Sequence, residues 1–116
     1  MNVNLILPYP PTINHYWLRN KDGGIRISAK GVNFREHCQW QAKAQKADKA
    51  LTGPLVVDIV AHMPDKRRRD LDNVLKALLD GLTHSGVWGD DSQVVDLRIR
   101  KASSLGGMVL VVVTPA

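Results

Sequence analysis

Two apolar stretches limit the folds open to this chain most strongly, because each must become a buried β-strand. Residues 108–113 read M-V-L-V-V-V without one polar side chain, a composition typical of a central strand covered on both faces. Residues 55–63 alternate instead, so that every second side chain from Leu55 to Met63 faces the core. The chain is therefore expected to fold around a β-sheet that contains these two strands.

Two further strands are predicted. Residues 2–7 alternate as a half-buried strand that stops at the following prolines. Residues 93–101 are expected to bury the apolar side chains of Val95, Leu97 and Ile99 and to expose the charged side chains between them.

A short exposed hairpin is predicted near the N-terminus. Residues 17–19 and 25–27 flank the turn sequence Asp22-Gly23-Gly24, which is a strong hairpin signal. This hairpin carries three cationic side chains that either reach a phosphate backbone or are simply solvated: Arg19, Lys21 and Arg26.

Two helices complete the predicted architecture. Ser28 is the predicted N-cap of a helix that runs to about Ala50 and buries Phe34, Cys38 and Ala42. Its basic stripe is either solvated or faces DNA, and consists of Arg35, Gln39, Lys43 and Lys46. A second helix, rich in leucine, follows Arg69 and ends between residues 81 and 86. The pattern predicts an α/β (α+β) fold with a mixed sheet and two helices.

Length, charge and cysteine content narrow the class of protein. The 116 residues are expected to form a single domain over 1–116. Sixteen Lys and Arg against eleven Asp and Glu give a formal net charge of +5, which favours a polyanion such as nucleic acid as the partner. With Cys38 as its one cysteine, no signal peptide and no membrane span, the chain is expected to be cytoplasmic.

Residues 63–76 combine cations and carboxylates in a pattern suited to phosphodiester chemistry. Lys66 to Arg69 precede Asp70, and Asp72 and Lys76 follow within a little more than one helical turn. Mg²⁺ prefers carboxylate oxygens, and Lys76, about 6 Å from Asp72 between Cβ atoms, is placed to stabilise charge on a phosphate. Asp80 shares the helix face but lies about 12 Å from Asp72 along the axis, and is left out of the site.

A second acidic pair, Asp90-Asp91, stands in a separate glycine-bounded loop. Every one of these carboxylates also has a purely structural explanation. Asp70 would be a helix N-cap, Asp72 a first-turn acid paired with Lys76, and Asp90-Asp91 a turn. Spacing alone leaves both interpretations open.

Three motifs resemble the RusA family of crossover-junction endodeoxyribonucleases, the Holliday-junction resolvases of bacteria and their phages. They are L-P-Y-P-P-T-I-N-H-Y at 7–16, M-P-D-K-R-R-R-D-L-D-N at 63–73 with Lys76, and W-G-D-D-S-Q-V-V-D-L-R at 88–98. The similarity covers nearly the whole chain. Thr12 stands where the family often has Ser, and the helix at 28–50 matches only loosely.

The resemblance implies a homodimeric, magnesium-dependent enzyme, with Mn²⁺ as an alternative ion, that makes paired symmetric nicks in four-way DNA junctions during recombination and repair. The family's catalytic carboxylates correspond to Asp70, Asp72 and Asp91, with Asp90 as a lesser candidate metal ligand, and its essential lysine corresponds to Lys76. Candidate DNA contacts are the hairpin cations and Lys66, Arg67, Arg68, Arg69 and Asn73. A bacterial or phage-encoded protein is expected.

Two other functions remain compatible with the sequence. A non-catalytic junction or duplex binder would keep the basic surface and lack metal-dependent nicking. A phosphohydrolase acting on nucleotides would need no extended basic surface, so strong salt dependence of binding to long DNA counts against it.

Overall fold

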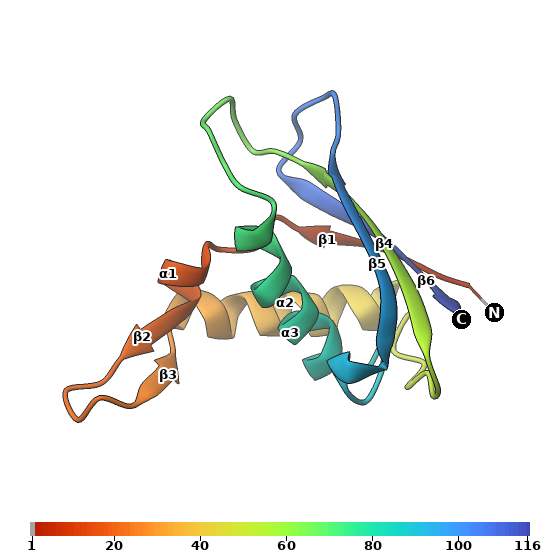
Figure 1. Cartoon of the computed structure of the whole chain (residues 1–116), viewed down its shortest axis with the longest axis horizontal. Helices are drawn as coiled ribbons and strands as arrows, with labels where there is room; N and C mark the ends of the chain where they lie inside the picture. Colours follow the sequence, from red (N-terminus) through yellow and green to blue (C-terminus); the bar gives the residue numbers. More distant parts are fainter. Residues whose placement is uncertain (1) are drawn as a thin grey trace.

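The fold is built on one four-stranded β-sheet. The computed structural model describes residues 2–116, without the side chains of residues 13 and 14. The strands are β1 (Val3–Pro8), β6 (Met108–Pro115), β4 (Leu55–His62) and β5 (Val94–Lys101), in that spatial order (Figure 1). β6 is antiparallel to both its neighbours, whereas β4 and β5 are parallel. The predicted mixed sheet is confirmed.

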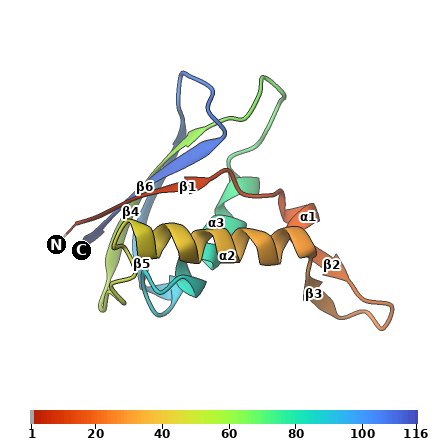
Figure 2. The ribbon, with the colours of Figure 1, turned by 180° about the vertical axis from the view of Figure 1, so that it is seen from behind.

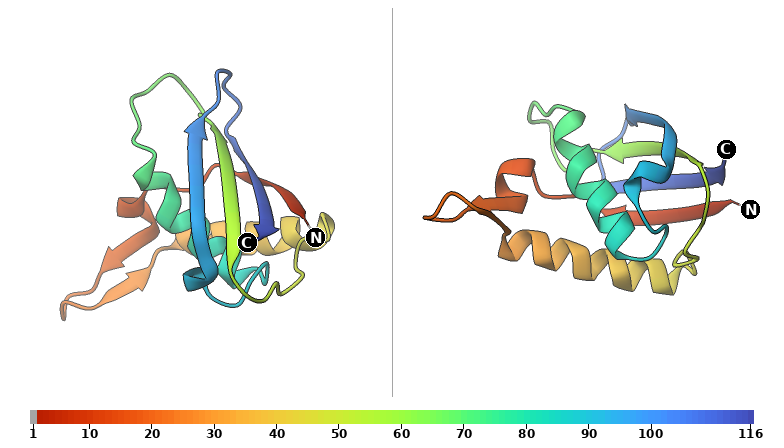
Figure 3. Two further views of the ribbon diagram at one scale, coloured as in Figure 1. Left: turned by 45° about the vertical axis from the view of Figure 1, so that its right-hand side comes forward. Right: turned by 60° about the horizontal axis from the view of Figure 1, so that its bottom comes forward.

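Two helices, α2 (Ala29–Ala44) and α3 (Asp72–His84), pack against one face of the sheet (Figures 2 and 3). The side chains beneath them are the alternate residues of β1, β4 and β6, including Leu5, Ile59 and Val111, each 2% exposed or less. The predicted alternation of residues 55–63 is confirmed on this side. No helix within residues 2–116 has both the length and the apolar composition needed to cross a bilayer.

The other face of the sheet carries no helix, which corrects the prediction that residues 108–113 are covered on both sides. Val111 is buried, but Val112 is 38% exposed and its antiparallel neighbour Asp58 lies on the same open face. Because both helices return to one side of the sheet, β6 is a central strand with a single covered face. An apolar run predicts a central strand, but it does not show whether one face of that strand or both faces are covered.

The burial predicted for residues 93–101 is confirmed for Ile99 and wrong for Val95 and Leu97. Ile99 packs against the core, whereas Val95 is 63% exposed and Leu97 37% exposed. The strand lies at the edge of the sheet, and its pairing steps from Leu55↔Val94 to Val56↔Asp96. Val95 is the extra residue of this β-bulge, so no residue of β4 is paired with it.

Both ends of α2 have an identifiable cause. Ser28 is the N-cap as predicted, and its side chain accepts a hydrogen bond from the Gly31 N–H at 3.0 Å. The predicted end near Ala50 is wrong, because Lys46 adopts a left-handed φ of 57° and the Ala47 N–H turns back to the Ala42 carbonyl at 2.7 Å. This Schellman-type closure ends the helix at Ala44 and buries Ala47.

The segment between β1 and α2 forms a projecting arm. The helical turn α1 (Ile13–Tyr16) leads into the hairpin of β2 (Trp17–Arg19) and β3 (Ile25–Ile27), which has the strands predicted for it and extends away from the body (Figure 1). The buried Tyr16 ring holds the arm in place through edge-on contacts with Trp17 and Phe34, at ring-centroid distances of 5.1 and 6.4 Å.

Gly81 lies where α3 packs closely against α2. A Cβ at this position would lie 2.9 Å from Cys38 Sγ and 3.0 Å from Phe34 Cε2. Gly81→Ala is therefore expected to lower the free energy of unfolding by up to about 2 kcal/mol, an overpacking cost that exceeds the gain of about 1 kcal/mol in helix propensity. Urea denaturation measures this change.

The same substitution in a Cys38→Ala background is the control for the Gly81 prediction, because the sulfur atom in the way has been removed. A smaller loss in that background gives a favourable coupling energy between the two positions. An equal loss in both backgrounds would show that Cys38 Sγ is not the atom that the new methyl group displaces.

Candidate active site

The loop at 63–71 joins the end of β4 to the start of α3, and Asp65 organises it. The Asp65 carboxylate accepts a hydrogen bond from the Arg67 backbone N–H at 2.9 Å and holds the Arg69 guanidinium through two bonds, one of them 3.1 Å long. The hydrogen bonds from Arg69, and then from Arg67, lower the pKa of Asp65 to about 2. The predicted cationic run is therefore folded around a carboxylate of its own.

Arg69 is fixed from two further sides. Its guanidinium lies 5.8 Å from the centre of the Tyr9 ring, and its carbonyl accepts a hydrogen bond from Lys101 Nζ at 2.6 Å. Its side chain is only 20% exposed, whereas Lys66, Arg67 and Arg68 are exposed. Three of the four cations thus remain open to a ligand.

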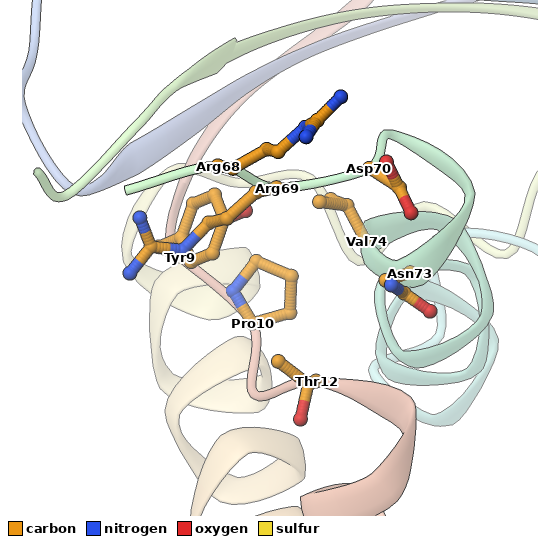
Figure 4. Close-up of a pocket in the computed structure, with 8 residues that line it drawn as sticks. All are labelled: Tyr9, Pro10, Thr12, Arg68, Arg69, Asp70, Asn73 and Val74. Carbon is orange, nitrogen blue, oxygen red and sulfur yellow. The ribbon is translucent and has the colours of Figure 1, made fainter. Parts of the chain in front are cut away.

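A pocket of about 440 Å³, called here the Asp70 pocket, lies between this loop and the proline-rich segment after β1. Figure 4 shows Asp70 and Asn73 on one side of it and Pro10 and Thr12 on the other. The full lining adds Tyr9, Arg68, Arg69 and Val74. The structure therefore brings together four predicted residues, from Arg68 to Asn73, in a cavity that pairs cationic side chains with a carboxylate.

Asp72 and Lys76 lie beside this pocket on α3. Asp72 is the first residue of the helix, Leu71 is its N-cap without any side-chain hydrogen bond, and Asp70 stands outside the helix. The interpretation of Asp70 as an N-cap is therefore wrong. Asp72 and Lys76 are both exposed, and no ion pair between them occurs among the described side chains. Both remain available to a ligand at the positive end of the helix dipole.

Asp80, two turns beyond Asp72 along α3, accepts hydrogen bonds from the other elements packed against this helix. Arg35 Nε donates to its Oδ2 at 2.8 Å and Arg35 Nη2 to its Oδ1 at 3.2 Å, and the Tyr16 hydroxyl donates to the same carboxylate. Burial and the Asp80 hydrogen bond together raise the pKa of Tyr16. This cluster ties the arm to α2 and α3, and it removes Arg35 from the predicted basic stripe, of which Gln39, Lys43 and Lys46 stay exposed.

The second acidic pair lies in the short helix η1 (Asp91–Gln93) and at its N-cap. Asp90 Oδ1 accepts the Ser92 N–H at 3.0 Å, and Gln93 Oε1 accepts the Asp90 N–H at 3.0 Å, which makes a capping box. The backbone bond to Ser92 lowers the pKa of Asp90. Asp90 therefore has a structural role as the N-cap of η1, where a turn was the structural alternative expected from the sequence, whereas Asp91 is exposed and takes no part in this cap.

Asp91 and Asp70 belong to opposite ends of the sheet. β4 and β5 run parallel, so the loop at 63–71 leaves the far end of β4 while η1 enters the near end of β5. Gln93 Nε2 confirms this placement, because it donates to the Leu51 carbonyl, just before β4, at 2.9 Å. Strands of eight residues span about 25 Å. Figure 1 likewise shows α3 running between the two loops.

One chain therefore does not assemble the three candidate ligands Asp70, Asp72 and Asp91. Within the part of the chain that the structure describes, no group of three or more His, Cys, Asp or Glu side chains is arranged to hold a metal ion. Asp70 and Asp72 are two residues apart at the start of α3, and Asp91 lies at the other end of the sheet. A metal site that uses all three is incomplete in a single chain.

Sequence reasoning overlooked three contributors to the site. Asp65 is the carboxylate that folds the cationic loop, Tyr9 is the ring beneath Arg69, and Lys101 bridges β5 to that loop. Asp65 alone gave a signal, since it is an acidic residue directly before a run of four cations. The other two become neighbours only through the fold.

The hairpin cations lie on the arm, apart from the Asp70 pocket. Arg19, Lys21 and Arg26 are all exposed, and the turn between them closes through an Asn20 N–H to Gly24 carbonyl bond of 2.7 Å. The arm and the loop at 63–71 thus form two separate cationic surfaces.

Comparison with known proteins identifies a family for this arrangement. The family model described as "Endodeoxyribonuclease RusA" matches residues 8–114. A crossover junction endodeoxyribonuclease of Enterobacteria phage 82 is 45% identical over 98 residues, covering 84% of this chain and 81% of that protein. The protein of the same name from Escherichia coli K12 is 44% identical with the same coverage. That of Enterobacteria phage HK97 is 42% identical over 102 residues, or 88% and 84% of the two chains.

The match spans the proline-rich segment, the cationic loop, α3 and η1, which are the parts that build both halves of the candidate site. Identity above 40% across four fifths of each relative is far more than a shared fold requires. The chain belongs to the RusA family of endodeoxyribonucleases.

Proposed function

We propose that this chain is a structure-specific endodeoxyribonuclease that resolves four-way DNA junctions. The observation that carries the proposal is the family match over residues 8–114, whose relatives are named crossover junction endodeoxyribonucleases. The Asp70 pocket supports it independently, because it combines a carboxylate with the exposed Arg68 and the partly buried Arg69 at the surface of a basic chain. The family also implies a divalent metal ion, and we propose Mg²⁺, with Mn²⁺ as an alternative.

Each part of the site has a role in this proposal. Lys66, Arg67 and Arg68 hold the phosphate backbone, Asn73 donates a hydrogen bond within the pocket, and Lys76 stabilises negative charge on the reacting phosphate. Asp70, Asp72 and Asp91 are the carboxylates that hold the metal ion, whose contribution is to polarise the phosphate and activate water. The hairpin cations Arg19, Lys21 and Arg26 contact a more distant part of the junction.

We infer that the enzyme is a homodimer and that the metal site lies between its chains. Asp70 and Asp72 are separated from Asp91 by the length of the sheet, so a second copy must bring its own Asp91 to the first copy's Asp70. In a dimer with two-fold symmetry, the Asp91 of each chain lies at the Asp70 of the other chain, which gives two equal sites. Two equal sites match the two-fold symmetry of a four-way junction and would make symmetric nicks. We propose that the enzyme acts in the cytoplasm of a bacterial or phage-infected cell.

Cleavage of a synthetic four-way junction tests the proposed function. Wild-type protein is expected to nick two opposite strands in Mg²⁺ and to bind without cutting in EDTA. Binding should weaken steeply between 50 and 200 mM salt, by about 10³-fold or more if six or more phosphates are contacted.

Two outcomes would contradict the proposal. Tight junction binding with no nicking in Mg²⁺ or Mn²⁺ would favour a non-catalytic DNA binder. Hydrolysis of a nucleotide together with weak, salt-insensitive binding to long DNA would favour a small-molecule phosphohydrolase. A linear duplex of the same length serves as the control for structure specificity.

A further inference from the structure

A second cavity, called here the α2 groove, continues from the Asp70 pocket across the proline-rich segment. It has a volume of about 450 Å³ and shares four lining residues with the Asp70 pocket: Tyr9, Pro10, Thr12 and Arg69. From there it extends to the N-terminal half of α2 and to His15 of α1. The two cavities therefore adjoin one another along these residues, and the α2 groove lies on the side away from Asp70.

The α2 side of this groove presents polar side chains at helical spacing. Lys30, Asn33 and His37 are three and four residues apart, so they share one face of α2, and all three are exposed. His15 of α1 faces the same cavity.

The charge of the lining selects a negatively charged occupant. Among the residues that the structure describes, no Asp or Glu lines the α2 groove, whereas Lys30 and Arg69 are cationic. Arg69 already pairs with Asp65, so Lys30 supplies the unpaired charge, and Asn33, His15 and His37 add groups able to donate hydrogen bonds to phosphate oxygens.

The remaining wall is apolar and rigid. Pro8, Pro10, Pro11 and Pro64 line it together with the rings of Tyr9 and Phe34. Proline fixes the backbone φ, so this wall exists before any ligand binds and costs little ordering on binding. Apolar and aromatic walls facing cations suit the sugars and bases of a single nucleic-acid strand. The volume is that of a small-ligand pocket, too small for a duplex.

We propose that the α2 groove carries the DNA strand that is cut, with Lys30, Asn33 and His37 holding its phosphates on one side of the scissile bond. This inference rests on the proposed function, since it takes the Asp70 pocket as the place of cleavage. At the exchange point of a junction each strand leaves one arm for the next, so its backbone turns away there from the strand it was paired with. The groove then sets the direction in which the strand leaves the site.

Salt-dependent binding of an uncut junction in EDTA tests the charge contribution. Lys30→Gln is expected to lower the slope of log K against log salt by about 0.7 to 0.9 and to weaken binding about five- to eightfold at 0.1 M salt. Lys43→Gln is the matched control, with the same charge change on an exposed residue of α2 outside the groove. Equal effects of the two substitutions would overturn the proposal.

Disulfide cross-linking locates the strand directly. Asn33→Cys is expected to capture a junction that carries a thiol tether on a phosphate at one side of the cleavage position, and not at the other side. Gln39→Cys, exposed on α2 outside the groove, is the control. Cys38 will not compete, because it is buried and burial raises the pKa of its thiol to about 12. No capture by Asn33→Cys, or equal capture by both variants, would overturn the proposal.

Neither measurement depends on catalysis, so the two proposals can fail separately. If wild-type protein nicks junctions while Lys30→Gln and Asn33→Cys behave like their controls, the function stands and the groove assignment falls. If wild-type protein binds but never nicks, the function falls, and the cross-links still decide whether a strand occupies the α2 groove.

Discussion

Asp72→Asn is expected to reduce the rate of junction cleavage in Mg²⁺ by at least roughly a hundredfold, because the amide keeps the shape of the side chain and removes a negative metal ligand. Junction binding should be retained or tightened, since repulsion between a carboxylate and the phosphate backbone is lost. The fold should survive, because Asp72 is exposed and its helix-dipole contribution is only about 0.3–1 kcal/mol. Single-turnover cleavage and gel-shift binding in EDTA separate these effects.

Asp48→Asn is the matched control for Asp72→Asn. It makes the same chemical change at an exposed residue in the segment after α2 and should leave the cleavage rate unchanged. Cleavage near the wild-type rate by Asp72→Asn would remove Asp72 from the metal site. It would leave Asp70 without the neighbour that makes the start of α3 a candidate active site.

The order of the elements could be predicted from the sequence because each has a local cause. Alternating apolar residues made β1 and β4, Asp22-Gly23-Gly24 closed the hairpin, and the Ser28 hydroxyl caps α2. These signals need only neighbours in the chain, so no knowledge of the tertiary structure was required.

The layers of the fold were harder to predict, because burial depends on elements that are distant in the sequence. Val112 and Val95 have the composition of core residues, but α2 and α3 both lie on the other side of the sheet from Val112, and a bulge displaces Val95 at the sheet edge. The premature end of α2 at Lys46 was equally hidden, since a left-handed lysine has no sequence signal comparable to glycine.

The candidate site also has a part that could be predicted from neighbours in the sequence and a part that depends on the tertiary structure. Asp70, Asp72 and Asn73 are neighbours in the chain, and their shared location at the start of α3 followed from spacing. Where Asp91 lies was not decided by spacing, because it depends on whether the strand after η1 runs parallel or antiparallel to β4. The parallel pairing sends Asp91 to the opposite end of the sheet. This separation is the reason for proposing a homodimer whose two chains share each site.

An equal mixture of Asp70→Asn and Asp91→Asn chains is expected to cut junctions, although each variant alone should be inactive. In a mixed dimer one site receives Asp70 from one chain and Asp91 from the other, both intact, and the second site receives both substitutions. Random exchange makes about half of the dimers mixed, so about a quarter of all sites should be active. Cleavage of a four-way junction after chain exchange measures this recovery.

The products of that mixture carry further information. A mixed dimer has one working site, so it should nick a single strand and leave a nicked junction, whereas the wild-type dimer releases two duplexes. Asp70→Asn mixed with Asp72→Asn is the control, because both substitutions remove ligands from the same chain's half of the site and no combination restores a complete one. An inactive Asp70→Asn and Asp91→Asn mixture, with mixed dimers shown by mass spectrometry, would mean that Asp91 does not act across the interface. The opposite ends of β4 and β5 would then separate Asp91 from the chemistry altogether.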